Sequence, residues 1–128
     1  MRPTIFFALA LAWVSPVAAQ QADSLPQGVT TATIAEGKKI FAGPGLCTAC
    51  HGPAAKGIPG LGADLTDSKW LHSDGSYEAL VTQITAGVPA TKSTSGVAMP
   101  AKGGSALSDA QVRAVSAYVW SLSHGTTH

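Results

Sequence analysis

The sequence predicts an all-α fold of three to four short helices joined by long loops. Two segments begin with a capping-box pattern, a Ser or Thr followed three positions later by Glu or Gln, at Thr33 to Glu36 and at Ser108 to Gln111. Apolar residues recur at helical spacing after each start. No run alternates apolar and polar residues as a strand does, and the connecting segments are rich in Gly and Pro.

Residues 1–19 predict a secretory signal peptide. Arg2 precedes an apolar run from Ile5 to Val14, and small residues end at Ala19, where we expect cleavage. The run is about half of the roughly twenty residues that a spanning helix needs, so we expect an exported, periplasmic protein, with an uncleaved anchor as the alternative. Residues 20–32 are polar and aperiodic, and predict a flexible leader.

The first helix is expected from the N-cap Thr33 to about Phe41. Its apolar face includes Gly37, which costs about 1 kcal/mol of helix propensity relative to Ala. A glycine in that position predicts that another backbone approaches closely. The other residues of this face are Ile34, Ile40 and Phe41.

Two further helices follow. Ser76 caps a helix from Tyr77 to about Ala86 that ends at Gly87, with Leu80, Val81 and Ile84 as its buried stripe. The helix opened by Ser108 runs to about Leu122, with an apolar face of Val112, Val115, Val119 and Leu122. The folded domain is therefore expected at 33–123, followed by a polar tail at 124–128.

The motif Cys47-Thr48-Ala49-Cys50-His51 matches the attachment signature of a c-type haem. Each thiol must reach one vinyl group on the same porphyrin edge, while the adjoining histidine turns a ring nitrogen to the iron. Alternatives are a thioredoxin-like dithiol, a disulfide and a zinc site. A zinc site needs two more ligands, and the remaining histidines, His72, His124 and His128, are scattered.

Met99 is the candidate for the second axial ligand, because it is the only methionine left after Met1. A thioether favours reduced iron, and an iron with both axial positions filled has no free site for oxygen or peroxide, which indicates one-electron transfer. His72 is the competing ligand, and it follows Trp70, which is either a wall of the haem site or a core residue. A displaceable ligand would instead predict a gas-binding or peroxidase-like protein.

These residues resemble the class I cytochrome c family over the span from Thr33 to Ser123. The resemblance implies that the first and last helices cross, with Gly37, Phe41 and Tyr118 at the crossing. It also implies long loops around one covalent haem c, with Cys47 and Cys50 as thioether attachments and His51 and Met99 as axial ligands.

The chain departs from the family pattern at two places. Relatives commonly have a proline whose carbonyl accepts a hydrogen bond from the ligand histidine, and Ala63 stands at that place. The segment from Val88 to Ala98 is longer than usual before the methionine. Both departures bear on how rigidly the two ligand loops are held.

The sequence therefore predicts a monohaem electron carrier, not an enzyme, that works as a monomer between a donor and an acceptor redox protein and touches membrane-bound respiratory complexes peripherally. Without Arg2, seven of the eight Lys and Arg balance seven Asp and Glu, which argues against nucleic acid as a partner. We expect Lys56, Lys92 and Lys102 either to dock an acidic partner or to be merely solvated. The alternative function is a haem subunit held permanently in a dehydrogenase or terminal-oxidase assembly.

Overall fold

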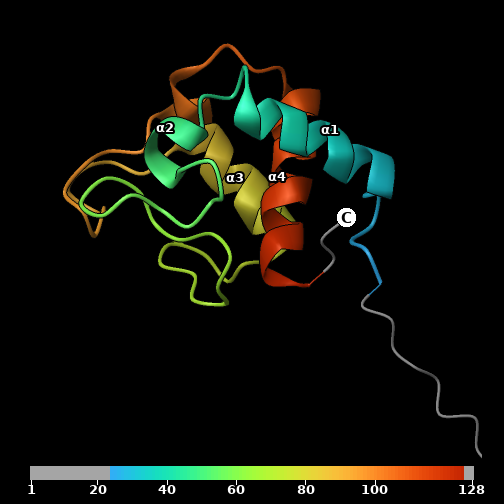
Figure 1. Cartoon of the computed structure of the whole chain (residues 1–128), viewed down its shortest axis with the longest axis horizontal. Coiled ribbons are helices and arrows are strands. Elements are labelled where there is room, and N and C mark those ends of the chain that lie inside the picture. The colour runs from blue at the N-terminus through green and yellow to red at the C-terminus, as the bar shows by residue number, and fades with distance from the viewer. Residues whose placement is uncertain (1–23, 126–128) are drawn as a thin grey trace, which may run out of the picture.

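A computed structural model describes residues 24–125, so the signal-peptide prediction for residues 1–19 and His128 lie outside the described residues. The described part contains helices and no strand, apart from two isolated β-bridges (Figure 1). The elements are α1 (Thr31–Ala42), α2 (Thr48–His51), α3 (Tyr77–Ala86), the 3-10 helix η1 (Ala101–Gly104) and α4 (Asp109–Ser123). The all-α prediction is confirmed.

The start of α1 differs from the sequence prediction. Thr30, not Thr33, is the N-cap, and its hydroxyl accepts a hydrogen bond from the backbone N–H of Thr33 at 3.1 Å. Val29 and Ile34 flank this cap and are both buried in the core, at the two positions that a hydrophobic staple pairs. Burial of this pair favours a helix that is capped by Thr30 over one capped by Thr33.

The flexible leader predicted at 20–32 is therefore wrong in its second half. Val29 is buried, and Leu25 packs against the core cluster. The backbone N–H of Val29 also donates to the carbonyl of Pro26 at 2.9 Å, which closes a turn before α1. The folded domain begins at least as early as Leu25.

α1 crosses α4 with very little space between the two backbones (Figure 1). A Cβ placed on Gly37 would lie 1.9 Å from the carbonyl oxygen of Ala114 and 2.9 Å from the Cβ of Tyr118. Phe41 meets the ring of Tyr118 edge to face, with centroids 5.4 Å apart. The predicted close approach at Gly37 is confirmed.

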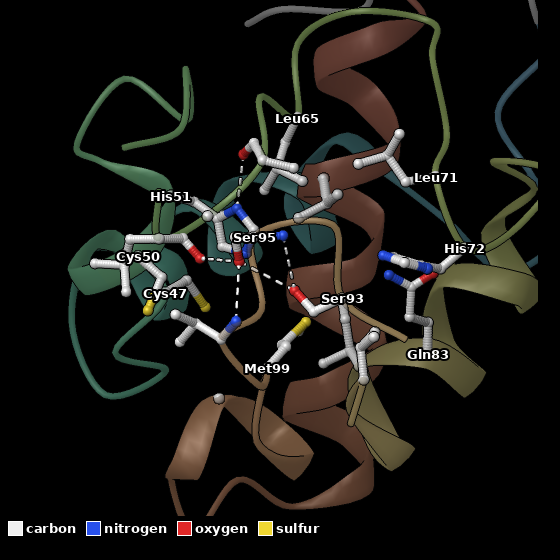
Figure 2. A pocket seen from close by; sticks show the side chains of 18 of the residues that line it. Cys47, Cys50, His51, Leu65, Leu71, His72, Gln83, Ser93, Ser95 and Met99 are labelled. Atoms are coloured by element: carbon white, nitrogen blue, oxygen red, sulfur yellow. Dashed lines mark hydrogen bonds between the residues drawn. The ribbon is translucent and has the colours of Figure 1, made fainter. Parts of the chain in front are cut away.

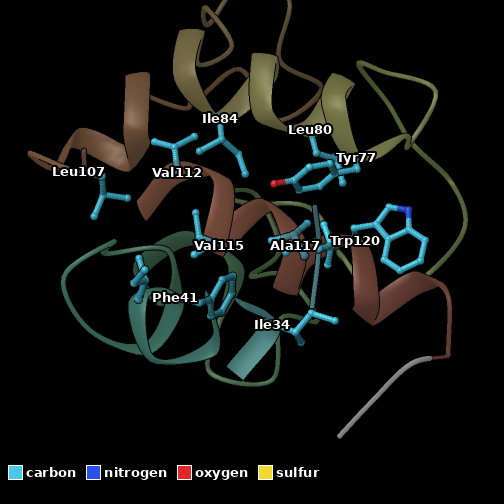
Figure 3. Packing of buried hydrophobic residues seen from close by; sticks show 14 of the residues in the cluster. Ile34, Phe41, Tyr77, Leu80, Ile84, Leu107, Val112, Val115, Ala117 and Trp120 are labelled. Carbon is cyan, nitrogen blue, oxygen red and sulfur yellow. The ribbon is translucent and has the colours of Figure 1, made fainter. Parts of the chain in front are cut away.

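The other two predicted helices begin where their caps were placed. The Ser76 hydroxyl accepts from Ala79, and Ser108 and Gln111 form the reciprocal capping box. α3 packs on the other side of α4, where the hydroxyl of Tyr77 donates to the carbonyl of Arg113 at 3.2 Å. Figure 3 shows the shared core, which includes Ile34, Phe41, Leu80, Ile84, Val112, Val115, Ala117 and Trp120.

α4 is thus the central element, with α1 and α3 on different sides of it. None of the helices among residues 24–125 has the length and apolar content needed to cross a membrane. The long loops 52–76 and 87–100 lie beside this helical core, and a cavity lies between them and the helices.

Candidate haem site

The cavity has a volume of about 680 Å³, within the range of cofactor sites. Helices supply one wall and the two long loops supply the others. Its apolar lining includes Phe41, Leu65, Leu80, Ile84, Val115 and Val119. A site of this kind suits a large flat apolar group with a few polar anchors.

Cys47, Cys50 and His51 lie on the cavity wall because a single helical turn presents them together. The N–H of His51 donates to the carbonyl of Cys47 at 2.9 Å, which closes the turn of α2. Figure 2 shows the two cysteine side chains side by side at one end of the cavity. The sequence predicts no helix at this motif, because four residues are too few for a periodic pattern.

Both cysteines are free thiols in the structure. Burial raises the pKa of the Cys47 thiol; backbone hydrogen bonding opposes this rise, and the nearby Cys50 adds a smaller increase. The described residues contain no cluster of three or more His, Cys, Asp or Glu side chains that would hold a metal. The zinc alternative therefore has no support in this part of the chain.

The His51 ring is oriented by the backbone of the following loop. Its Nδ1 lies 2.8 Å from the carbonyl oxygen of Ala63, and because a carbonyl only accepts, Nδ1 carries the proton and donates. In the neutral ring this leaves Nε2 with a free lone pair for a metal. Ala63 thus makes the contact for which relatives use a proline.

The neighbouring residue Asp64 fixes the same loop. Its carboxylate accepts hydrogen bonds from the hydroxyl of Thr66 at 2.6 Å and from the backbone N–H of Thr66 at 2.7 Å. These bonds hold the pKa of Asp64 below its ordinary value, with a smaller contribution from Lys56. The carbonyl of Ala63 is therefore presented from a braced turn.

Met99 reaches into the cavity from the side opposite His51, with its sulfur pointing inward (Figure 2). Met99 and Val88 exchange two backbone hydrogen bonds of 2.9 and 2.8 Å, which closes the long loop at its base. A Cβ on Gly87 would lie 2.3 Å from the carbonyl oxygen of Met99, so only glycine fits there. The long segment from Val88 to Ala98 is therefore held in place at its two ends.

A second link joins the loop 87–100, which carries Met99, to the loop 52–76, which follows His51. The hydroxyl of Ser95 donates to the carbonyl of Leu61 at 3.3 Å and accepts from the N–H of Val97 at 3.3 Å. Ser93 supports it, with the two serine hydroxyls 3.0 Å apart. The Ser95 hydroxyl thus links the loop that carries Met99 to the loop that follows His51 (Figure 2).

The remaining candidate residues take different places. Trp70 lines the cavity and also packs against the core, so it is both a wall of the site and a core residue. His72 lines the cavity at an exposed edge, away from the two cysteines (Figure 2). His124 stacks on Trp120 and bonds its carbonyl at 2.8 Å, outside the cavity lining.

The three lysines differ in their freedom to dock a partner. The Lys102 ammonium donates to the carbonyl of Leu107 at 2.9 Å and pairs with Asp109 at 3.2 Å. Lys56 donates to Thr66 and lies 3.9 Å from Asp64. Lys92 is exposed and has no ion-pair partner within the described residues.

Sequence reasoning missed Gln83. It lines the cavity between the buried residues Leu80 and Ile84 of α3, and its side-chain oxygen is buried without a hydrogen-bond partner among the described residues. The signal was present as a polar residue three positions after Leu80, within the apolar stripe of the helix.

These residues fit a c-type haem. Two thiols at one end, an imidazole nitrogen on one side and a thioether on the other form the donor set such a group needs, and the rest of the lining is mainly apolar. It remains a prediction that Cys47 and Cys50 attach the haem and that His51 and Met99 bind its iron.

Comparison with known proteins gives a consistent family. The family model described as cytochrome c oxidase, cbb3-type, subunit III matches residues 32–119, which is more than half of the chain. The cbb3-type cytochrome c oxidase subunit CcoP of Rubrivivax gelatinosus is 38% identical over 95 residues, covering 71% of this chain and 26% of that protein. Subunit FixP of Bradyrhizobium sp. is 46% identical over 93 residues, covering 71% of this chain and 28% of that protein.

The CcoP subunit of Rhodobacter capsulatus gives a similar result, with 38% identity over 94 residues, 70% of this chain and 29% of the relative. The chain thus spans less than a third of the length of these curated relatives. No solved structure is significantly similar to it.

Proposed function

The chain belongs to the c-type cytochrome domains of the cbb3-type cytochrome c oxidase subunit III family, and on this premise we propose that it passes single electrons within a cytochrome c oxidase assembly. The observation that carries the proposal is the convergence of Cys47, Cys50, His51 and Met99 on one cavity. The relatives favour a haem subunit of an oxidase, the alternative named above, over a free carrier.

We propose one covalently attached haem, because the sequence has two cysteines and both belong to the single motif. The haem supplies an iron that changes between ferrous and ferric. The chain's own residues do the rest: Ala63 orients His51, Val88 fixes the backbone of Met99, and the apolar walls exclude water. Export to the periplasm with cleavage near Ala19 is part of the proposal, because residues 1–19 have the basic start, apolar run and small-residue end of a secretory signal peptide.

Optical spectroscopy of the purified protein tests the site. We expect sharp reduced c-type bands that carbon monoxide leaves unchanged. Met99→Leu keeps the side-chain volume but removes the sulfur, so carbon monoxide should then bind to the reduced protein. Thr91→Ala, an exposed change in the same loop, is the control and should behave like the wild type. Carbon monoxide binding by the wild type would instead favour a gas-binding or peroxidase-like protein.

Affinity purification from the native membrane fraction tests the assembly. Retention of the tagged chain with oxidase activity through detergent washing and size exclusion supports a permanent subunit. Elution of the haem protein alone, with full activity left in the remaining oxidase, would mean that the protein is a free carrier with the same site.

A further inference from the structure

Gln83 is the feature of the cavity that the proposed function leaves unexplained. Its side-chain oxygen Oε1 is buried and has no hydrogen-bond partner among the described residues. Leaving such an atom unpaired is costly, because it has lost its hydrogen bond to water and gained none in return. An apolar residue at this position would have continued the stripe of Leu80 and Ile84 without that cost, so the amide calls for a polar partner inside the cavity.

The position of Gln83 narrows the identity of that partner. Figure 2 shows Gln83 and His72 at the end of the cavity away from Cys47 and Cys50. Gln83, His72 and Val88 also line a second cavity of about 580 Å³ and so form the partition between the two. A group bound in the first cavity therefore meets the Gln83 amide at its edge remote from the thiols.

The chemistry of the haem supplies a polar group at that edge. The two vinyl groups that react with thiols stand on one side of the porphyrin, and its two carboxyl groups stand on the other. A haem tethered at Cys47 and Cys50 therefore turns its carboxyl groups toward the remote end of the cavity. Because Oε1 is an acceptor, it needs a donor, which a protonated carboxylic acid provides and a carboxylate does not.

We propose that Gln83 pairs with a haem carboxyl group in its protonated form, with Oε1 accepting the acid O–H and Nε2 donating to the acid carbonyl. This inference rests on the proposed function and adds a residue that tunes it. The hydrogen bond from the acid O–H to Oε1 can form only with the neutral acid and favours it, and the apolar neighbours Leu80 and Ile84 disfavour the carboxylate. Gln83 acts as a positioning residue that keeps negative charge away from the iron.

The pairing links electron transfer to a proton. Oxidation removes one electron to the acceptor, and where the acid titrates it also releases one proton to solvent, because the more positive iron favours the carboxylate. The reduction potential then falls with rising pH by at most about 59 mV per pH unit, the value for one proton per electron.

Other titratable groups must be separated from this effect. Besides His51 and the two cysteines of the motif, the charged and titratable side chains lining the two cavities are Asp64, Asp67, Lys69, His72, Lys102, Asp74 and Lys92. His72 is the one histidine in this set. His72→Asn is therefore the control for a histidine origin of the pH dependence.

The test is the reduction potential of the haem-loaded protein as a function of pH, for the wild type, Gln83→Leu, His72→Asn and Thr85→Ala. Thr85 is exposed on α3 and lines neither cavity. We expect Gln83→Leu to move the titrating range down by about one pH unit, a tenfold loss of proton affinity. The two controls should keep the wild-type range.

Reduced-minus-oxidised infrared spectra give a second readout. The wild type should show the carbonyl band of a protonated carboxylic acid, shifted in Gln83→Leu and in the milder Gln83→Asn. Potential curves that coincide for wild type and Gln83→Leu, or a pH dependence lost only in His72→Asn, overturn the inference and leave the proposed function standing. Absence of covalent haem from the wild type would overturn both.

Discussion

Single atoms decide how the two candidate ligands are presented. The carbonyl of Ala63 orients His51 at 2.8 Å, and the hydroxyl of Ser95 reaches the carbonyl of Leu61 from the methionine loop. Neither contact depends on a particular side chain at its acceptor, because both acceptors are backbone oxygens. The side chain of Ala63 is therefore free to vary as long as the loop keeps its path.

Ala63→Pro tests this point. The backbone N–H of Ala63 makes no backbone hydrogen bond among the described residues, so proline removes none, and its carbonyl remains. We expect the free energy of unfolding to rise by about 0.4–1 kcal/mol, because the unfolded chain loses conformational freedom. Thermal denaturation of both forms measures this. A loss of more than 1 kcal/mol would show that the loop path at residue 63 is incompatible with proline.

At the scale of the elements, two contacts differ in burial. One is the crossing of α1 and α4, and the other is the hydrogen bond by which Ser95 joins the two long loops. The crossing is a backbone contact at Gly37, surrounded by buried side chains of both helices. The loop closure by Ser95 lies at an exposed position. We therefore expect a change at the crossing to affect global stability and a change at Ser95 to affect the ligand loop.

Gly37→Ala should destabilise the fold although alanine is the better helix former. The gain in propensity is about 1 kcal/mol, but the new Cβ would lie 1.9 Å from the carbonyl oxygen of Ala114, so the helices must separate. We expect a net loss of about 1–3 kcal/mol. Chemical denaturation measures it, with the exposed Lys38→Ala on α1 as control. Equal stability of the two variants would contradict a tight crossing.

Ser95→Ala should loosen Met99 without unfolding the protein. The bond to Leu61 is solvent-exposed, so its loss costs at most about 1 kcal/mol. We expect faster carbon monoxide binding to the reduced protein. The oxidised protein should have a weak far-red band from charge transfer between the Met99 sulfur and the iron, and in Ser95→Ala this band should disappear at a lower alkaline pH than in the wild type. Ser95→Thr retains the hydroxyl and should restore both properties, while Thr91→Ala should change neither. Identical carbon monoxide kinetics in wild type and Ser95→Ala would refute the role of Ser95.

For the whole molecule, positive and negative charges nearly balance. The formal net charge of the chain is +1. Of the three lysines that the sequence marks as docking candidates, Lys56 and Lys102 have partners within the protein, and Lys92 is exposed and free of ion pairs within the described residues. A permanent place in an assembly needs less long-range steering than a free carrier does.

Electron-transfer rates should therefore depend weakly on ionic strength. Screening acts on exposed charges beyond about 10 Å at 0.1 M salt, and the nearly balanced charges of this chain give little net attraction to screen. We expect less than a threefold change between low and moderate salt, with Lys92→Ala as the lysine variant of largest effect and Lys102→Ala altering stability instead. A steep fall in rate with salt would reinstate electrostatic docking of an acidic partner.

The sequence by itself determined the features that depend on neighbouring residues. The spacing of Cys47, Cys50 and His51 indicated haem attachment, and Ser76 and Ser108 placed the starts of α3 and α4, because caps and attachment motifs act within a few positions. Gly37 predicted a close approach of another backbone for the same reason, because the loss of helix propensity at a glycine depends only on its own position.

The tertiary structure decided what depends on residues far apart in the chain. The buried pair of Val29 and Ile34 moved the start of α1 to Thr31. The cavity that brings Met99 to the side opposite His51, and that leaves the Gln83 oxygen without a partner, is formed by loops and helices from the whole domain. Burial and pairing are properties of the packed chain, so periodicity alone could mark Gln83 as polar but could not tell what it faces.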